Sequence, residues 1–269
     1  MEAVHFHHPD WCAKVIRRRV GAELLDMLAC FALAFATRGR SLNWSPMDRT
    51  PSAYYQSMRR LCRAGLVVSS PIGGGLPELR LTEAGAARQS PECRPESWWN
   101  RKWTGRWYVL TYDIPEIRRS YRNHFRAFLK RLRLGRLHRS VMVTPVDIRA
   151  EFDDLVQGAG AGDYAVLFES RTVLGMPAGA IVRAAWDFGD LAVRHRWYLE
   201  TERRNRARVQ ARRMPPAEAV TLAREEMTAY LSVMGNDPLL PRALWPPTYL
   251  GEEVYRAHRE FQSAIARLL

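Results

Sequence analysis

The stretch that decides the fold of this chain runs from Trp107 to Val143 and reads "WYVLTYDIPEIRRSYRNHFRAFLKRLRLGRLHRSVMV". Its first part, 107–113, is mostly apolar, as is typical of a buried strand, and Pro115 ends that strand. An arginine-rich segment with helical periodicity, 116–134, follows, and "GRLHRSVMVTP" predicts two short strands or one bent strand. The helix should bury one stripe of apolar residues, namely Ile117, Tyr121, Phe125, Phe128, Leu129 and Leu132.

The next segments complete a recognisable order of elements. "VDIRAEFDDLVQGAG" (146–160) predicts a second helix, and "DYAVLFES" (163–170) predicts a further strand. The order strand, helix, strand, strand, helix, strand is that of a ferredoxin-like βαββαβ fold. The sequence therefore predicts a ferredoxin-like domain over residues 98–175.

The charge of the chain points to its kind of partner. The 269 residues include 41 Lys+Arg and 28 Asp+Glu, which gives a net charge of +13. A surplus of this size favours a polyanion such as nucleic acid, because Lys and Arg release counterions when they bind phosphates. The alternative is a protein with a generally basic surface. Hydrophobic residues make up 47% of the chain, which excludes wholesale disorder.

Cysteine and hydropathy patterns bear on the compartment. No C-x-x-C pair is present, which excludes a zinc ribbon and a thioredoxin motif. Scattered free cysteines fit a reducing cytoplasm, where we expect the protein to act. The apolar run 27–36 is too short to cross a bilayer and predicts a core helix, so no membrane span is expected. The cysteines are Cys12, Cys30, Cys62 and Cys93.

The extreme N-terminal segment "HFHHPDWCAK" is rich in potential metal ligands. Its side chains follow no standard metal-site spacing, and chain ends are usually mobile. We therefore predict no metal and no cofactor for it. The potential ligands are His5, His7, His8 and Cys12.

Residues 17–90 predict a winged helix-turn-helix domain. Thr50 is suited to cap the second full helix, Pro51 suits its first position, and Gly65 suits its end. A glycine-rich turn between two short strands predicts the wing, at about Ile72 to Leu76. The predicted elements, in order, are a helix over 21–36, a turn or short helix over 41–48, a helix over 49–65, and strands over 66–70 and 78–82.

The second full helix has two distinct faces. Tyr54, Met58, Leu61 and Cys62 share one face at helical spacing and should pack inward. The other face offers side chains that read base edges and bind phosphates. The alternative is that its arginines only form a solvated surface. The predicted DNA-binding residues are Ser52, Tyr55, Gln56, Arg59, Arg60 and Arg63.

The rest of the chain predicts a linker and a helical domain. In "RQSPECRPES" (88–97), Pro91 and Pro95 are expected to block regular structure. Residues 178–269 predict a helical C-terminal domain that contains a proline-rich loop. The predicted fold class is therefore α+β, with a winged helix-turn-helix, a ferredoxin-like domain and a helical domain in that order.

Asp113 raises the question of catalysis. The pattern of strand, acid, basic helix and "RSV" strand resembles the small nuclease-like protein of CRISPR adaptation complexes, in which an acid at this position is linked to metal-dependent cleavage. The alternative is that Asp113 caps the next helix or pairs with Arg118 or Arg119. Metal catalysis needs a fuller set of ligands than one carboxylate, so we expect a structural role and no enzyme.

Four further segments resemble the PaaX family of bacterial transcriptional repressors. They are "RRLCRAGLV" (59–67), "WTGRWYVLTYDIPE" (103–116), "AWDFGDLAVRHRWYLE" (185–200) and "DPLLPRALWPPTYLGEEVY" (237–255), and the resemblance covers nearly the whole chain. It implies a dimeric, DNA-binding repressor of phenylacetate catabolism that is released by an aryl-acyl-CoA.

These patterns leave three functions in competition. The first is a cytoplasmic homodimeric repressor that binds a double-stranded DNA operator, the second a metal-dependent nuclease that uses Asp113, and the third a basic interaction protein. For the repressor, an acyl-CoA or aromatic acid effector would bind near "RHRWYLETERRNRAR", where arginines and aromatic residues alternate. The alternative for that segment is an exposed helix face or a dimer surface. The candidate effector residues are Arg194, Arg196 and Trp197.

Overall fold

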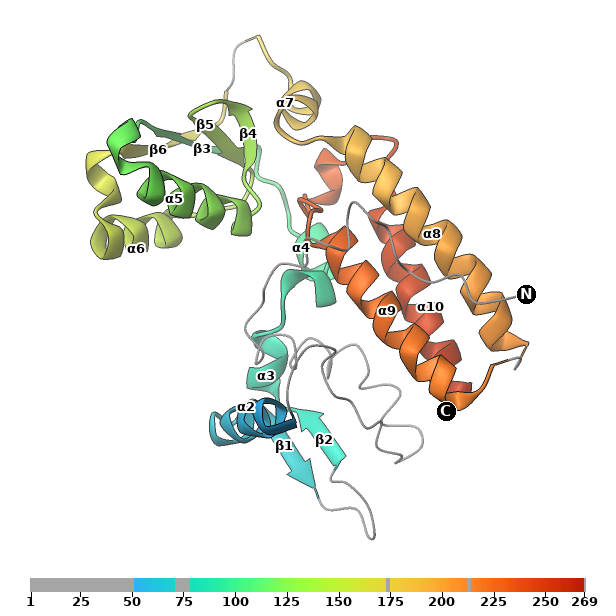
Figure 1. Cartoon of the computed structure of the whole chain (residues 1–269). Helices are drawn as coiled ribbons and strands as arrows, with labels where there is room; N and C mark the ends of the chain where they lie inside the picture. The colour runs from blue at the N-terminus through green and yellow to red at the C-terminus, as the bar shows by residue number, and fades with distance from the viewer. Residues whose placement is uncertain (1–50, 71–77, 173–174, 212–213, 269) are drawn as a thin grey trace. The chain divides into compact units, whose positions relative to one another are not determined.

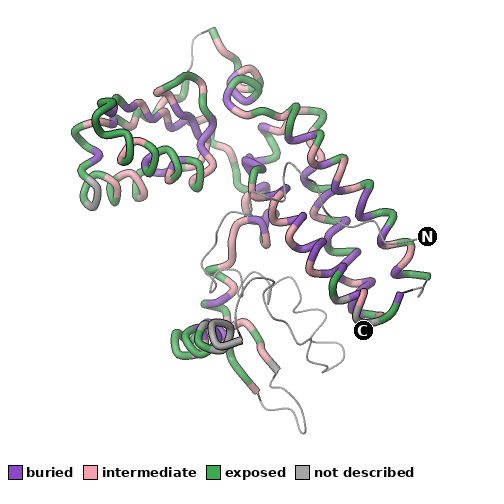
Figure 2. The backbone as a smooth tube through the Cα atoms, viewed as in Figure 1, coloured by how far each residue is buried: buried purple, intermediate pink, exposed green. Residues whose placement is uncertain are grey.

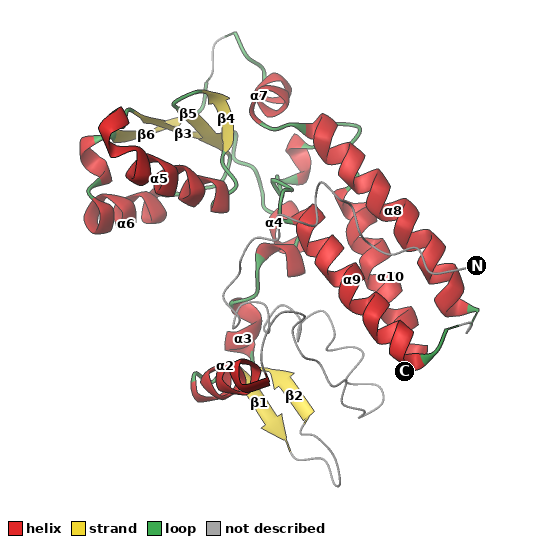
Figure 3. Ribbon diagram, in the orientation of Figure 1, coloured by secondary structure: helices red, strands yellow, loops and turns green. Residues whose placement is uncertain are grey.

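The protein is described by a computed structural model that covers residues 51–70, 78–172, 175–211 and 214–268 (Figure 1). It is an α+β structure with a helical C-terminal part (Figure 3). The predicted helix over 21–36, the turn over 41–48 and the histidine-rich segment lie outside the described residues.

The contacts divide the chain into two compact units. The central unit consists of Glu96–Val193 and Asn236–Tyr249. The terminal unit consists of the described residues up to Pro95, Arg194–Gly235, and those from Leu250 onward. The division into domains 17–90, 98–175 and 178–269 stays a prediction.

The central unit is built on a four-stranded sheet in which every neighbouring pair of strands is antiparallel. The strand order is β4-β5-β3-β6, and Val109 in the central strand lies opposite Val143 on one side and Phe168 on the other. The predicted order of strands and helices is present, with two short strands in the middle. The elements are β3 (Trp107–Tyr112), α5 (Arg119–Arg131), β4 (Gly135–His138), β5 (Val141–Thr144), α6 (Arg149–Ala159) and β6 (Ala165–Ser170).

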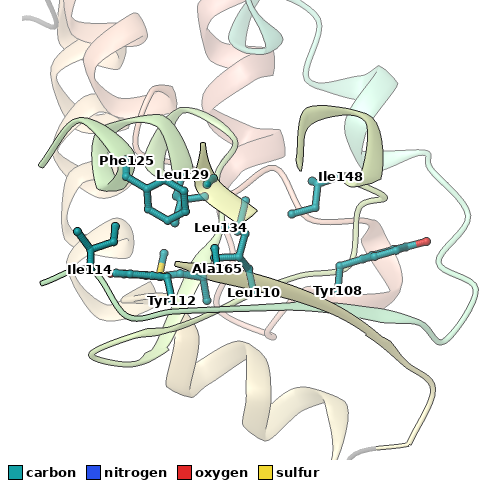
Figure 4. Close-up of a cluster of buried hydrophobic side chains, with 11 residues drawn as sticks. Tyr108, Leu110, Tyr112, Ile114, Phe125, Leu129, Leu134, Ile148 and Ala165 are labelled. Atoms are coloured by element: carbon teal, nitrogen blue, oxygen red, sulfur yellow. The ribbon is translucent and has the colours of Figure 1, made fainter. Parts of the chain in front are cut away.

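Helices α5 and α6 cover one face of this sheet (Figure 1). Leu110 from β3 and Leu129 from α5 are both fully buried, and Phe125 and Ile148 complete the contact between the layers (Figure 4). Burying a large apolar side chain contributes about 1.5–3 kcal/mol, so these contacts contribute substantially to the unit's stability.

The prediction that Ile117 belongs to the buried stripe is wrong, because its side chain is 94% exposed. Ile117 lies in a short 3-10 turn, η3 (Glu116–Arg118), and α5 starts only at Arg119. The helical phase that buries Phe125 and Leu129 therefore does not extend back to it. The remaining predicted stripe residues are partly buried against the core: Tyr121, Phe128 and Leu132.

The other face of the sheet is covered in part by α7 (Ala178–Ala185) and by the loop that contains η5 (Arg242–Leu244). Trp107 and Val143 from the sheet pack there against Val182 of α7 and Leu240 of the loop. The proline-rich loop therefore packs with the sheet, although in sequence it lies between two C-terminal helices.

The terminal unit contains a helical part and a smaller hairpin part. Its long helices carry buried residues along one face each (Figure 2), among them Tyr230, Phe261 and Ile265. Within the described residues, no helix has both the length and the apolar character that crossing a membrane requires. The helices are α8 (Phe188–Gln210), whose first residues belong to the central unit, α9 (Pro216–Met234) and α10 (Gly251–Leu268).

The prediction of an irregular linker at 88–97 is wrong in part. Residues Pro91–Cys93 form a 3-10 turn, η2, and Glu96–Trp99 form a short helix, α4. Proline is tolerated at the first position of a helix, where the missing N–H has no partner to lose, so Pro91 starts η2 instead of preventing it. Glu92 is buried, and its backbone carbonyl accepts a hydrogen bond of 2.7 Å from the Tyr230 hydroxyl.

Candidate nucleic-acid interface

Helix α2 (Pro51–Arg63) starts and stops where the sequence predicts. Pro51 is its first residue, and Gly65 adopts the left-handed conformation, with φ of +67°, that only glycine reaches without strain. The Gly65 N–H donates to the Cys62 carbonyl and the Leu66 N–H donates to the Leu61 carbonyl, each at 3.0 Å. These bonds satisfy the last carbonyls of the helix and turn the chain into the next strand.

An antiparallel hairpin of β1 (Val67–Ser70) and β2 (Glu78–Leu81) follows α2. A small core joins the helix to the hairpin, as the inward face of the helix predicts. The predicted core residue Tyr54 lies in α2, but its side chain is outside the described part. The core contains Met58, Leu61, Leu66 and Val67, with Cys62, Leu79 and Leu81 partly buried against it.

Thr82 ties the end of the hairpin to the end of α2. Its hydroxyl donates to the Gly65 carbonyl at 2.7 Å and accepts from the Gly85 N–H at 3.0 Å, which caps the short helix α3 (Glu83–Ala87). A Cβ atom added at Gly85 would lie 2.0 Å from the Leu66 carbonyl oxygen. Only glycine permits this approach, which packs α3 against the residue that connects α2 to β1.

The predicted reading face of α2 is exposed wherever its side chains are described. Ser52 and Tyr55 lie within α2, but their side chains are outside the described part, and so is the predicted wing 72–76. The exposed side chains are Gln56, Arg59, Arg60 and Arg63.

The arginines of α2 have no acidic neighbour within their own helix. Helix α2 contains no Asp or Glu, and within the described residues no carboxylate pairs with Arg59, Arg60 or Arg63. On α8, by contrast, Arg206 pairs with Glu202. An exposed cluster of cations without counter-charges attracts phosphate groups, so α2 is the candidate interface.

Asp113 lies exposed after β3, and its N–H donates to the Tyr164 carbonyl at 2.8 Å. The prediction that its carboxylate caps the following helix is wrong, because the cap positions of η3 and α5 are Pro115 and Arg118. The extended Ile114–Pro115 segment separates the acid from the first turn. The predicted pairing with Arg118 or Arg119 is also wrong: among the described residues, the Asp113 carboxylate has no hydrogen bond or ion pair.

Glu116 takes the structural role that was expected of Asp113. Arg122 donates two hydrogen bonds to its carboxylate, of 2.5 Å and 3.0 Å, and these bonds hold the pKa of Glu116 below its ordinary value. In the described part of the chain, no group of three or more His, Cys, Asp or Glu side chains is arranged to hold a metal ion.

The three candidate effector residues lie on α8 and do not form one surface. Arg194 and Trp197 are half-buried, whereas Arg196 is exposed. Residues three apart share a face of a helix and residues two apart do not, so Arg194 and Trp197 lie on one side and Arg196 on another.

A buried polar cluster between α8, α9 and α10 was missed by the sequence reasoning. The carboxylate of Glu226 accepts hydrogen bonds from the Tyr198 hydroxyl, from Nδ1 of His258 at 2.7 Å and from Nε2 of Gln262 at 2.6 Å. All four side chains are buried, and burial is the main cause that raises the pKa of Tyr198. The signal available in the sequence was the spacing of four between His258 and Gln262 on the apolar side of α10.

Glu202 lies one turn after Tyr198 on α8. It is buried and pairs with Arg206, with 2.9 Å between Oε1 and Nε. Burial raises the pKa of Glu202 to about 7, although the charge of Arg206 acts in the opposite direction. This carboxyl therefore titrates near neutral pH.

A second missed network anchors the proline-rich loop of the central unit. The Tyr249 hydroxyl accepts a hydrogen bond from Nε1 of Trp99 at 2.9 Å and donates to the Asp237 carboxylate, whose oxygens lie at 2.9 and 3.0 Å. Asp237 in turn accepts the Leu239 N–H at 2.7 Å, and Leu239 has a φ of +48°, which is strained for leucine. The network holds the loop in a conformation that its own residues do not favour.

A basic helix with a hairpin, an antiparallel sheet covered by two helices, and a helical C-terminal part together define an α+β protein with a cationic surface. Two family models match the chain: "PaaX protein central Cas2-like domain" over residues 100–182 and "PaaX-like protein C-terminal domain" over residues 186–268. The chain belongs to the PaaX family, a family of transcriptional regulators, and the resemblance found in the sequence is confirmed.

A solved structure shares the fold. It is the "Uncharacterized protein Rv0674 from Mycobacterium tuberculosis", which is 17% identical, with a TM-score of 0.52 over 93% of this chain and 97% of that chain. Among curated proteins, none matches the sequence.

Proposed function

We propose that this protein is a DNA-binding transcriptional repressor of a catabolic operon, relieved by a small anionic effector such as an aryl-acyl-CoA. The observation that carries the proposal is the face of α2 on which Arg59, Arg60 and Arg63 are exposed and, among the described residues, without a carboxylate partner. Membership of a regulator family supports the same conclusion.

In this proposal the hairpin and α2 belong to a winged helix-turn-helix, the central unit is ferredoxin-like, and the protein acts as a cytoplasmic homodimer. Gln56 and Arg59 have the side chains that bind base edges in pairs of hydrogen bonds, whereas Arg60 and Arg63 bind phosphates. Ser52, Tyr55 and the wing at 72–76 complete the interface. A dimer would bind two half-sites of a palindromic operator.

The test starts from a random pool of double-stranded DNA, from which the bound sequences are selected and their affinities measured by fluorescence anisotropy. Arg59→Ala should weaken binding to the selected sequence by about 1–3 kcal/mol if Arg59 contacts a base through two hydrogen bonds. Arg267→Ala, at an exposed position on α10, is the control and should change little. If the Arg59→Ala variant binds the selected sequence as tightly as the wild type does, α2 is not the recognition helix.

The effector part of the proposal has its own test. Titration calorimetry with a panel of aryl-acyl-CoA compounds should give binding heat, and Arg194→Ala and Trp197→Ala should reduce the affinity, since these two share a face of α8. Arg196→Ala serves as the comparison on another face. A panel that produces no heat removes the effector from the proposal.

The nuclease reading is supported by the exposed position of Asp113 and by the match to a Cas2-like central domain, but among the described residues no group of side chains is arranged to hold a metal ion. It is tested in the same DNA incubations by adding magnesium or manganese. The proposal that the protein is not an enzyme predicts intact DNA. Metal-dependent cleavage that disappears in Asp113→Asn would replace the repressor proposal with the nuclease.

A further inference from the structure

A second basic surface lies on the central unit, on the outer side of α5. The helix reads "RSYRNHFRAFLKR" and contains no Asp or Glu. Its buried side faces the sheet through Phe125 and Leu129. Its exposed cations are Arg119, Arg126, Lys130 and Arg131.

Three of these cations form a line along the helix. Arg119, Arg126 and Lys130 are separated by seven and four residues, which are close to two turns and one turn of an α-helix. At 1.5 Å per residue, the line is about 16 Å long. Over that length, B-DNA carries about ten phosphates.

Tyr112 extends this line onto the turn between β4 and β5. Its hydroxyl accepts a hydrogen bond from Nε of Arg126 at 3.0 Å and lies 3.2 Å from the Arg139 carbonyl, to which it donates. The backbone of the exposed Arg139 is therefore tied through Tyr112 to the Arg126 guanidinium. This buried tyrosine orients Arg126 and places the turn that carries Arg139 beside α5.

The line is not neutralised by acids within the described residues. No carboxylate there pairs with Arg119, Lys130 or Arg139, and the acid nearest in sequence, Glu116, is bound by Arg122. Helix α5 contains no acid and keeps an excess of positive charge beside Glu116, whose carboxylate interacts with the charges of Arg119 and Arg126; the other acids of the helical layer are on α6. They are Glu151, Asp153 and Asp154.

The chemistry of this surface favours a polyanion over another protein. The outer side of α5 presents Asn123 and Ala127 between its cations, and the exposed large apolar residues of the unit lie elsewhere, at Val156, Val166 and Phe168, with Ile117 ahead of the helix. The core of a protein interface is apolar and depleted in charge, which this surface is not.

We propose that Arg119, Arg126, Lys130 and Arg139 form a second nucleic-acid contact, which binds the phosphate backbone independently of base sequence. This inference rests on the proposed DNA-binding function and adds a surface to it. Contacts to phosphates supply affinity and salt dependence, whereas base contacts supply specificity, so the surfaces on α5 and α2 have separable signatures.

The experiment measures the affinity of the full-length protein for one duplex between 50 and 200 mM KCl. The logarithm of the affinity falls with the logarithm of the salt concentration, and each lost phosphate contact reduces the magnitude of this slope by about 0.9. Arg119→Ala/Lys130→Ala should therefore reduce the magnitude of the slope by about 1.8. The matched control is Arg171→Ala/Arg183→Ala, which removes two exposed arginines of the same unit and should leave the slope unchanged. Tyr112→Phe should change the slope by less, because it frees the Arg126 guanidinium without removing its charge.

Thermal denaturation and sedimentation of each variant accompany the binding curves. A slope equal to that of the wild type, in a double variant that is folded, overturns the inference. The inference is also overturned if the double variant changes the association state of the protein but not the salt slope, because the surface would then bind protein.

The two proposals fail in different ways. Binding that depends on α5 but shows no sequence preference and no response to Arg59→Ala leaves the α5 surface standing and removes the repressor. If binding is sequence-specific and responds to Arg59→Ala, but the salt slope of the α5 variant is unchanged, the repressor proposal stands and the α5 surface is removed. A wild type that binds no duplex at low salt overturns both.

Discussion

Nδ1 of His258 lies 2.7 Å from Oε1 of Glu226, and both side chains are buried in the terminal unit. The His258 ring also stacks on Tyr230, with 3.8 Å between the ring centroids. Glu226 belongs to α9 and His258 to α10, so the pair fixes how these two helices are aligned.

Removing the Glu226 carboxylate should therefore be costly. Glu226→Ala leaves the Tyr198 hydroxyl, His258 and Gln262 without their common acceptor, and each buried polar group left without a partner costs about 1–3 kcal/mol. The free energy of unfolding, measured by urea denaturation, checks this. Glu200→Ala, at an exposed position on α8, is the control and should change stability by less than about 0.5 kcal/mol. A loss for Glu226→Ala no larger than that of the control would contradict the network.

Glu202 should make stability depend on pH near neutrality. Burial raises its pKa from 4.5 to about 7, so between these values the folded protein holds a proton that the unfolded chain has released. The folded state is therefore destabilised as the pH rises through this window. Glu202→Gln resembles the protonated form, so its stability relative to the wild type should increase from pH 5 to pH 8. The free energy of unfolding is measured by urea denaturation at both pH values. For the control, Glu200→Gln, the difference in stability from the wild type should be the same at both. If the stability of Glu202→Gln relative to the wild type decreases from pH 5 to pH 8, the pKa of Glu202 is not raised in the folded protein.

Gly135 should tolerate no side chain. A Cβ atom at this position would lie 2.5 Å from the indole of Trp186 and 2.7 Å from the Ala185 Cβ, and overpacking of this kind typically costs about 1–3 kcal/mol. Gly179→Ala is the matched control, because its nearest contact is the flexible end of Arg183 at 3.4 Å and alanine is favoured in a helix. Thermal denaturation should show a lower melting temperature for Gly135→Ala and an equal or higher one for Gly179→Ala. Equal melting temperatures for the two variants would contradict the close packing of α7 on β4.

Tyr249→Phe should destabilise the central unit. It removes the acceptor of the Trp99 indole N–H and a donor to Asp237, and a buried polar group left without a partner costs about 1–3 kcal/mol. Tyr164→Phe is the control, because within the described residues the Tyr164 hydroxyl makes no hydrogen bond. Chemical denaturation gives the midpoint of unfolding of each variant. A midpoint for Tyr249→Phe that matches the control would show that the loop is held by its apolar contacts alone.

Local patterns of the sequence determined most of the helices and strands. Pro51 and Gly65 mark the two ends of α2, and the spacing of Phe125, Leu129 and Leu132 predicts the buried side of α5, because backbone conformation and helical periodicity depend on residues close in sequence. The order of the motifs also sufficed to indicate the PaaX family. The exposure of Arg59, Arg60 and Arg63 followed from the same periodicity.

Contacts between residues far apart in sequence were decided only by the tertiary structure. Ile117 is exposed because the chain makes a 3-10 turn before α5, and residues 91–99 are ordered with Glu92 bonded to a tyrosine 138 positions away. Asp113 is exposed where a cap was expected, while Glu226 gathers partners from two other helices. Hydrogen bonds of this kind depend on which surfaces meet after the chain has folded, and no periodicity within a single helix or strand carries that information.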